Sequence, residues 1–177
     1  RVGTPIILDA DALNAFVGDV DRLHGRDGLD VVITPHPGEM ARLLGTTVDD
    51  VQANRVEIAR QFAMAHHLHV VLKGYRTVIA TPNGDVFLNL TGNPGMAVGG
   101  TGDVLTGVLA AWSAQLLDAD AACKVAVYVH GMAGDIAEVD KGEISMSASD
   151  LTAHLGTALL DLSSSNQIED ESQGNQN

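Results

Sequence analysis

His69-Val-Val-Leu-Lys73 begins the stretch of sequence that decides the fold, and Thr77-Val-Ile-Ala-Thr81 and Asp85-Val-Phe-Leu-Asn89 continue it. The first run is apolar almost throughout, which is typical of a strand buried on both faces of a parallel sheet. The other two runs flank Pro82-Asn-Gly84, and an Asn-Gly pair between apolar runs is a strong signal for a hairpin. The stretch therefore predicts an antiparallel hairpin that extends a parallel sheet.

Two further strands are predicted upstream, at Pro5-Ile-Ile-Leu-Asp9 and Asp30-Val-Val-Ile-Thr34. Both runs end in polar residues, as buried parallel strands do where they reach the carboxyl edge of a sheet. Before His69, apolar residues recur at helical spacing and predict one amphipathic helix, with Val51, Ile58, Phe62 and Ala65 on its buried face. Strand, helix and strand in this order predict an α/β fold.

Helices dominate the rest of the chain. A glycine-rich loop from Thr91 to Gly102 precedes two segments that are apolar nearly all round, 103–117 and 119–138, and both are predicted to be deeply buried helices. A last helix is predicted from about Ser149 to Leu162, with Ser147 and Asp150 as a capping box. Residues 1–162 then form one partial domain, and residues 163–177 are predicted to be a disordered polar tail.

Composition excludes several classes of partner. Among 177 residues, 10 basic and 23 acidic side chains give a net charge of −13, which disfavours nucleic acid and anionic membrane surfaces. No apolar run reaches the roughly 18 residues of a membrane span. The single cysteine, Cys123, argues for a reducing compartment, so the predicted location is cytoplasmic.

The strongest chemical signal is Gly99-Gly-Thr-Gly-Asp103 at the start of an apolar helix. Glycines let backbone amides approach an anion and a helix start adds partial positive charge, so Gly99, Gly100, Thr101 and Gly102 form a candidate anion hole. Asp103 is then a candidate base for a substrate hydroxyl that receives a phosphoryl group. The alternative is a glycine turn with Asp103 as an ordinary N-cap.

Three other segments follow predicted strands. Lys73-Gly-Tyr-Arg-Thr77 offers a cation and a close backbone approach to phosphates, or is only a turn. Within Thr34-Pro-His-Pro-Gly-Glu39, two prolines hold His36 in an extended loop where it could contact a ligand. Glu39 is either a favourable first-turn acid or a magnesium organiser acting through water. Asp9-Ala-Asp-Ala-Leu-Asn14 suits water-mediated magnesium or ligand binding, or Asp11 caps the next helix.

Taken in order, these segments resemble the ADP- or ATP-dependent (S)-NAD(P)H-hydrate dehydratase family, a carbohydrate-kinase-like branch of the ribokinase-like superfamily. The similarity runs from Arg1 to about Leu160 and covers the C-terminal part of the family domain. The segments that carry it are Asp9-Ala-Asp-Ala-Leu-Asn14, Pro35-His-Pro-Gly-Glu39, Val71-Leu-Lys-Gly74 with Thr77, and Asn93-Pro-Gly-Met-Ala-Val-Gly-Gly-Thr-Gly-Asp103. The wider ribokinase-like kinases share mainly the last of them.

The resemblance implies a three-layer α/β/α sandwich and dehydration of the 6S form of hydrated NADH or NADPH. A nucleotide phosphorylates the added ring hydroxyl, phosphate then leaves, and the reduced cofactor is restored. Mg²⁺ and ADP, or ATP, are the implied cofactor and phosphoryl donor. By this analogy His36 and Asp103 contact the hydrated substrate, and the adenine nucleotide is contacted by Lys73, Gly74, Tyr75, Arg76, Thr77 and Gly102.

One departure from the family pattern is the absence of a substantial part that normally precedes the Asp9 segment. We therefore expect a missing N-terminal segment, or a homo-oligomer, to complete the sheet. Two alternative functions stay open at this point. One is a ribokinase-like kinase for a vitamin precursor, and the other is a catalytically idle nucleotide-binding fragment.

Overall fold

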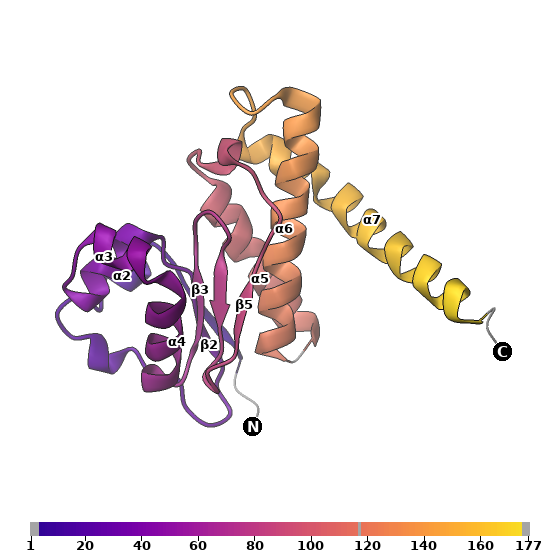
Figure 1. Ribbon diagram of the computed structural model, residues 1–177. Helices are drawn as coiled ribbons and strands as arrows, with labels where there is room; N and C mark the ends of the chain where they lie inside the picture. Colours follow the sequence, from indigo (N-terminus) through magenta and orange to yellow (C-terminus); the bar gives the residue numbers. More distant parts are fainter. Residues whose placement is uncertain (1–3, 117, 175–177) are drawn as a thin grey trace. The chain divides into compact units, whose positions relative to one another are not determined.

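All five predicted strands form, and they make one mixed sheet in the order β1-β2-β3-β4-β5 (Figure 1). The computed structural model describes residues 4–116 and 118–174. The strands are β1 (Ile6–Leu8), β2 (Val31–Ile33), β3 (His69–Leu72), β4 (Val78–Ala80) and β5 (Val86–Leu88). The first three are parallel, whereas β4 pairs antiparallel with both β3 and β5. The predicted hairpin on a parallel sheet is confirmed.

The helices of the described residues are α1 (Asp11–Asn14), α2 (Pro37–Leu44), α3 (Val48–Ala53), α4 (Arg55–His66), α5 (Thr101–Leu116), α6 (Ala119–Lys141) and α7 (Ala148–Gly174). Two short 3-10 helices, η1 (Val20–Arg22) and η2 (Pro94–Met96), lie between them. The chain divides into two compact units. The first unit comprises Arg1–Leu90 with Leu105–Val127, and the second unit comprises Thr91–Val104 with Tyr128–Asn177.

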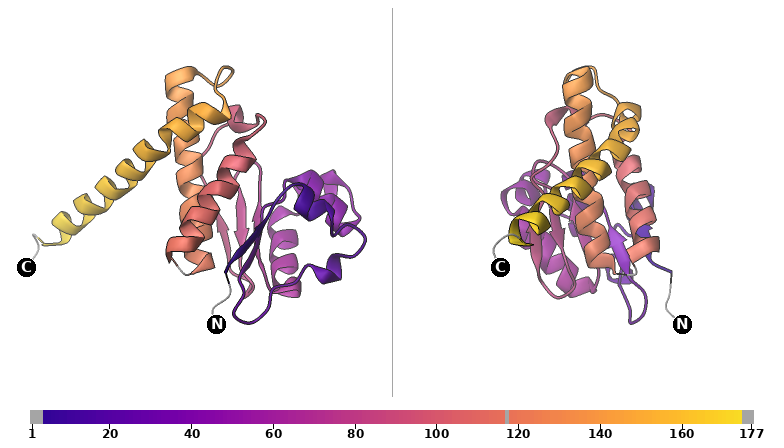
Figure 2. Two further views of the ribbon diagram at one scale, coloured as in Figure 1. Left: turned by 180° about the vertical axis from the view of Figure 1, so that it is seen from behind. Right: turned by 90° about the vertical axis from the view of Figure 1, so that its right-hand side faces the viewer.

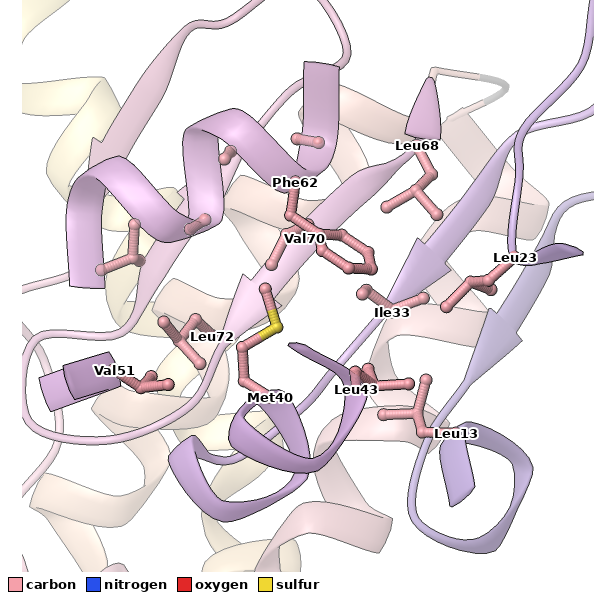
Figure 3. Close-up of a cluster of buried hydrophobic side chains, with 14 of the residues drawn as sticks. Leu13, Leu23, Ile33, Met40, Leu43, Val51, Phe62, Leu68, Val70 and Leu72 are labelled. Carbon is pink, nitrogen blue, oxygen red and sulfur yellow. The ribbon is translucent and has the colours of Figure 1, made fainter. Parts of the chain in front are cut away.

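The first unit is a three-layer α/β/α sandwich, because alternate strand residues pack against different helices. One side of the sheet contributes Ile33 and Val70 to a cluster with Met40, Leu43 and Phe62, and their side chains converge in Figure 3. The opposite side contributes other residues to a second cluster, whose members include Val32, Val71, Ile79, Leu105, Leu109 and Cys123. Helices α4 and α5 therefore cover opposite faces (Figure 2).

The turn between β4 and β5 follows from its sequence. Gly84 has a φ of +89°, which glycine adopts without steric cost, and its N–H donates to the carbonyl of Thr81 at 2.9 Å. Thr81 also accepts, through its Oγ1, a hydrogen bond from the N–H of Asp85 at 3.2 Å. The Asn-Gly signal thus located the hairpin turn.

The helices depart from prediction in two places. The single helix expected before His69 is two helices, because the chain breaks at Asn54, and the buried face of α4 is formed by Ala59, Phe62 and Ala63 while Ala65 is exposed. Helix α5 is not buried all round: its buried residues recur every fourth position, at Thr101, Leu105, Leu109 and Ser113. Its exposed positions include Gly107, Ala110, Ala111 and Ala114, small residues that raise the apolar content of the sequence without requiring burial.

The last two helices also differ at their ends. Helix α6 continues to Lys141, beyond the predicted end at Glu138, and it leaves Tyr128 40% exposed, so it too is not deeply buried throughout. The capping box of α7 is confirmed, since the Ser147 N–H donates to Asp150 Oδ2 at 2.9 Å. Helix α7 continues to Gly174, beyond the predicted end at Leu162, and the hydroxyls of Ser163 and Ser164 donate back to the Leu160 carbonyl.

Leu117, the predicted end of the first long helix, and residues 175–177 of the predicted tail lie outside the described residues. Within 4–116 and 118–174, no helix has both the length and the apolar character needed to cross a membrane.

Candidate functional site

In the first unit, Lys73 lies between two carboxylates that come from distant parts of the chain. Its Nζ donates to Asp9 Oδ1 at 2.7 Å and lies 3.9 Å from Glu39 Oε2. The Thr106 hydroxyl donates to the other Asp9 oxygen at 3.1 Å. Asp9 and Lys73 follow the carboxyl ends of β1 and β3, which meet at the same edge of a parallel sheet. The Lys73 amine is therefore committed to an ion pair.

The Asp9 carboxylate is held in its charged form. Burial would raise the pKa of Asp9. The hydrogen bond and the charge of Lys73 lower it, and hydrogen bonds from Thr34 and Thr106 lower it further. Together these contacts bring the pKa of Asp9 below its ordinary value of 3.8. Asp9 and Lys73 thus form a mostly buried pair, with side chains 11% and 20% exposed.

A lowered pKa in the folded state predicts a specific pH dependence. The stability contributed by Asp9 is fully present above its unfolded-state pKa and is lost as pH falls through the lower folded-state pKa. Asp9→Asn should reduce the free energy of unfolding by about 2 kcal/mol at neutral pH, because Lys73 loses its nearest counter-charge. The difference between wild type and variant should shrink as pH falls below the ordinary value of 3.8. Urea denaturation across that pH range measures it.

The matched control is Asp19→Asn, which removes an exposed carboxylate paired with Arg22. Surface pairs of this kind contribute about 0–1 kcal/mol, so this variant should follow wild type closely. If the Asp9→Asn difference were the same at every pH, the paired carboxylate would not be its cause.

His36 begins α2 as its N-cap. Its Nδ1 accepts from the N–H groups of Gly38 at 3.0 Å and Glu39 at 3.2 Å, while Glu39 Oε2 accepts from the His36 N–H at 2.7 Å. Nδ1 therefore carries no proton, and the neutral ring bears its proton on Nε2. The backbone at His36 is extended, with φ −79° and ψ 166°, and its side chain is half exposed. The predicted extended loop is confirmed, and Glu39 is a first-turn acid.

The segment from Lys73 to Thr77 is a largely exposed loop, and the Arg55 side chain holds its backbone by hydrogen bonds. The Arg55 guanidinium donates to three carbonyls, those of Tyr75 at 2.7 Å, Leu72 at 3.0 Å and Lys73 at 3.2 Å. Tyr75 is 80% exposed, and the Arg76 guanidinium lies 5.2 Å from its ring centroid. Arg55 was not predicted from the sequence, although a cation in the first turn of a helix, where the helix dipole favours acids, was an available signal.

The second unit contains the glycine-rich loop. Helix α5 begins at Thr101, so Asp103 lies in its first turn and not at its N-cap, and the N-cap alternative was wrong. The Thr101 hydroxyl donates to the carbonyls of Met96 at 2.8 Å and Val98 at 2.9 Å. Gly100 has a φ of +94°, and the Val104 N–H donates to its carbonyl at 3.1 Å. These contacts fix the loop at the start of the helix.

Asp103 itself is exposed, and among the described residues its side chain has no hydrogen-bond or ion-pair partner. The beginning of the loop is held by Asp135, which accepts from the Gly92 N–H at 2.9 Å and from Asn93 Nδ2 at 3.1 Å. Asp135 was also missed, and a carboxylate inside the otherwise apolar segment of α6 was the signal that could have found it. The loop is thus anchored at both ends, and its terminal carboxylate is accessible.

Two further predictions concern the segment after β1. Helix α1 begins at Asp11 with Ala10 as its N-cap, so Asp11 is not a cap. The Asn14 side chain donates to Asp11 Oδ1 at 3.4 Å, which occupies that carboxylate locally. Asp9 is therefore the member of this segment that contacts other predicted site residues.

Among the described residues, no group of three or more His, Cys, Asp or Glu side chains could hold a metal ion. Asp9 and Glu39, the nearest candidates, already share Lys73. Mg²⁺ commonly binds through one or two carboxylates and substrate phosphates while it keeps several waters. A Glu39 contact with Mg²⁺ through water therefore stays a prediction.

The sequence of this chain matches a known protein family. Residues 1–156 match the carbohydrate-kinase family that is described as NAD(P)H-hydrate dehydratase. The chain belongs to the NAD(P)H-hydrate dehydratase family. The predicted resemblance is confirmed.

Relatives within the dehydratase family include a bifunctional NAD(P)H-hydrate repair enzyme Nnr from Moorella thermoacetica, 49% identical over 92% of this chain and 30% of that protein. An ADP-dependent (S)-NAD(P)H-hydrate dehydratase from Neisseria meningitidis is 40% identical over 78% of this chain and 47% of that protein. The chain thus spans about a third to a half of the length of these relatives.

A solved structure supports the same fold. The ADP/ATP-dependent NAD(P)H-hydrate dehydratase from Bacillus subtilis, co-crystallised with ATP and Mg²⁺, is 37% identical with a TM-score of 0.80. The similarity covers 89% of this chain and 55% of the Bacillus chain. The predicted ribokinase-like sandwich is therefore confirmed for the part of the dehydratase fold that this chain contains.

Proposed function

We propose that this chain contributes to nucleotide-dependent dehydration of the 6S form of hydrated NADH or NADPH. The observation that carries the proposal is the exposed carboxylate of Asp103, which has no partner in the described part of the chain and lies directly after the glycine turn at the start of α5. A carboxylate without intramolecular partners is available to a substrate hydroxyl, and the adjoining backbone amides favour negative charge. The names of the Moorella and Neisseria relatives agree with this reaction.

In the proposed reaction, Asp103 accepts the proton of the added ring hydroxyl while the hydroxyl oxygen attacks the terminal phosphorus of the nucleotide. The bond from that phosphorus to the bridging oxygen breaks, and AMP leaves from ADP, or ADP from ATP. The C–O bond of the phosphoester then breaks, and inorganic phosphate leaves with the bonding pair. Loss of a ring proton restores the double bond of NAD(P)H. Phosphorylation helps because phosphate is a better leaving group than hydroxide.

We assign the remaining contacts by the same reasoning. The amides of Gly99, Gly100, Thr101 and Gly102 stabilise charge on the transferred group, and His36 contacts the hydrated nicotinamide nucleotide. The donor is contacted at Gly102 and by the segment Lys73, Gly74, Tyr75, Arg76 and Thr77. Since Lys73 is paired with Asp9, we expect that segment to act mainly through its backbone amides and Arg76. Mg²⁺ would enter with the nucleotide and neutralise phosphate charge.

The test mixes this chain with hydrated NADH, Mg²⁺ and either ADP or ATP, and follows the absorbance band of reduced nicotinamide. Recovery of that band with one nucleotide, but not without nucleotide, is the expected result and names the donor. Inorganic phosphate should appear in equal amount. A stable phosphoester product would instead indicate a vitamin-precursor kinase. Nucleotide binding without any product would indicate an idle binding module.

Two features of the biological setting stay predictions. We propose that a preceding segment or a second copy completes the sheet, since β1 forms one edge of the described sheet and Ile6 is 41% exposed. Sedimentation of this chain, alone and with an added preceding segment, distinguishes the two. The cytoplasmic location rests on Cys123 as the single cysteine.

A further inference from the structure

The loop after β3 presents backbone amides that nothing in the described part of the chain uses. The N–H of Lys73 donates to the Pro35 carbonyl at 2.8 Å. The next three N–H groups, those of Gly74, Tyr75 and Arg76, have no hydrogen-bond acceptor among the described residues. Gly74 and Arg76 have positive φ angles of 133° and 54°. The loop backbone is thus held in an unusual conformation with its donors unpaired.

Arg55 determines which way these amides point. In a planar trans peptide, the C=O and the following N–H point in opposite directions. The guanidinium takes the carbonyls of Lys73 and Tyr75, so the N–H groups of Gly74 and Arg76 must point away from Arg55. Because Arg55 binds these carbonyls on one side of the loop, the N–H groups of Gly74 and Arg76 face the other side.

The position of Arg55 beneath the loop is close and specific. A Cβ added at Gly74 would lie 2.9 Å from one guanidinium nitrogen of Arg55, so the guanidinium packs closely against the loop backbone. Nη1 and Nη2 are both bonded to carbonyls, while Nε is buried and has no partner in the described residues. Burial lowers the pKa of Arg55 from its ordinary value. An arrangement that uses two guanidinium nitrogens on three carbonyls cannot be reproduced by the single ammonium of lysine.

The charge of Arg55 also points to an anionic ligand. Among the described residues, Arg55 forms no ion pair with a carboxylate, whereas Arg60 on the same helix pairs with Glu57. Arg55 is partly buried, and withdrawing a charge from water without a counter-charge is costly unless something offsets it. Three carbonyl dipoles offset it in part, and an anion bound at the opposite side of the loop would complete the compensation.

We infer that Arg55 is a positioning residue for the phosphoryl donor: it orients the Gly74 and Arg76 amides toward the phosphates of an adenine nucleotide. Arg55 does not touch the nucleotide and acts through the loop backbone. The inference rests on the proposed function, because it assumes that this loop meets the donor. It adds a residue outside the loop and states which backbone groups make the contact.

The test compares Arg55→Lys with Arg60→Lys, a matched change on the exposed side of α4. For the nucleotide that wild type binds, calorimetry should give a Kd about tenfold higher in Arg55→Lys and unchanged in Arg60→Lys. Where turnover is measured, KM for the nucleotide should rise while kcat stays near wild type, since no reacting group is altered. Circular dichroism checks that both variants are folded.

Two more measurements separate positioning from general destabilisation. Without nucleotide, trypsin should cut after the exposed Arg76 faster in Arg55→Lys than in Arg60→Lys, since the loop has lost its internal support. In Arg55→Ala, added guanidinium ion at concentrations far below denaturing ones should restore nucleotide affinity, and methylammonium should not. A merely structural role would not produce this selective rescue.

The outcomes are distinct. If wild type binds nucleotide and Arg55→Lys binds it equally well, Arg55 does not position the donor, and the proposed function is unaffected. If wild type binds neither ADP nor ATP, the proposed nucleotide site fails and the role of Arg55 fails with it. A raised Kd, unchanged kcat and guanidinium-specific rescue together support the inference.

Discussion

Asp103→Asn is expected to lower the rate of NAD(P)H recovery by about 10²–10⁴-fold, the usual contribution of a positioned acid or base. Asparagine keeps the size of the side chain but cannot accept the hydroxyl proton. The contribution of Asp103 as a base is expected to come from its placement beside the substrate hydroxyl. Single-turnover recovery of nicotinamide absorbance measures the loss, and the Kd of the nucleotide should change much less.

The control for Asp103→Asn is Asp49→Asn, which also neutralises an exposed acid in the first turn of a helix. Both changes remove the same interaction with a helix dipole, so their effects on stability should be similar and small. Only Asp103→Asn should affect turnover. Equal activity in both variants would mean that Asp103 is not the base, and the glycine turn would be left as an anion-binding feature alone.

The strands were predictable because each is a short apolar run bounded by polar residues, proline or glycine. Asn83 and Gly84 indicated the hairpin, and the observed strands differ from the predicted ones by no more than one residue at each end. The burial and bounds of the helices were harder to predict, since the apolar content of a helix does not show which of its faces other elements cover. Helix α5 has many small residues but buries one narrow stripe, and the break at Asn54 interrupts a pattern that was continuous in sequence.

The candidate site was predictable in part. Local backbone chemistry identified His36 and Gly99–Asp103, since prolines and glycines act on their own neighbours. Pairings between distant segments were not predicted, such as Lys73 with Asp9, which are 64 residues apart. The role of Arg55 was not predicted for a related reason. Its partners are backbone carbonyls, which every residue has and which no sequence motif indicates. Sequence motifs therefore indicated the candidate ligand-binding groups better than the side chains that hold those groups in place.

The second large effect is expected at Gly131, on the α6 surface that contacts the beginning of the glycine-rich loop. A Cβ there would lie 2.2 Å from Thr91 Oγ1 and 2.8 Å from the Thr91 carbonyl carbon and oxygen. A side chain could rotate away, but the backbone of Thr91 must shift. We expect Gly131→Ala to lower the free energy of unfolding by about 3 kcal/mol, at the upper end of the usual cost of over-packing.

A shift of the Thr91 backbone should also displace the beginning of the glycine-rich loop, because Thr91 adjoins Gly92 and Asn93, the two residues that Asp135 holds. The matched control is Gly156→Ala in α7, where an added Cβ meets nothing within 4 Å. Helix propensity alone should make that variant more stable by about 0.5–1 kcal/mol. Urea denaturation of both variants measures the difference. If Gly131→Ala were also stabilising, α6 would not pack closely against Thr91, and anchoring of the loop would depend on Asp135 alone.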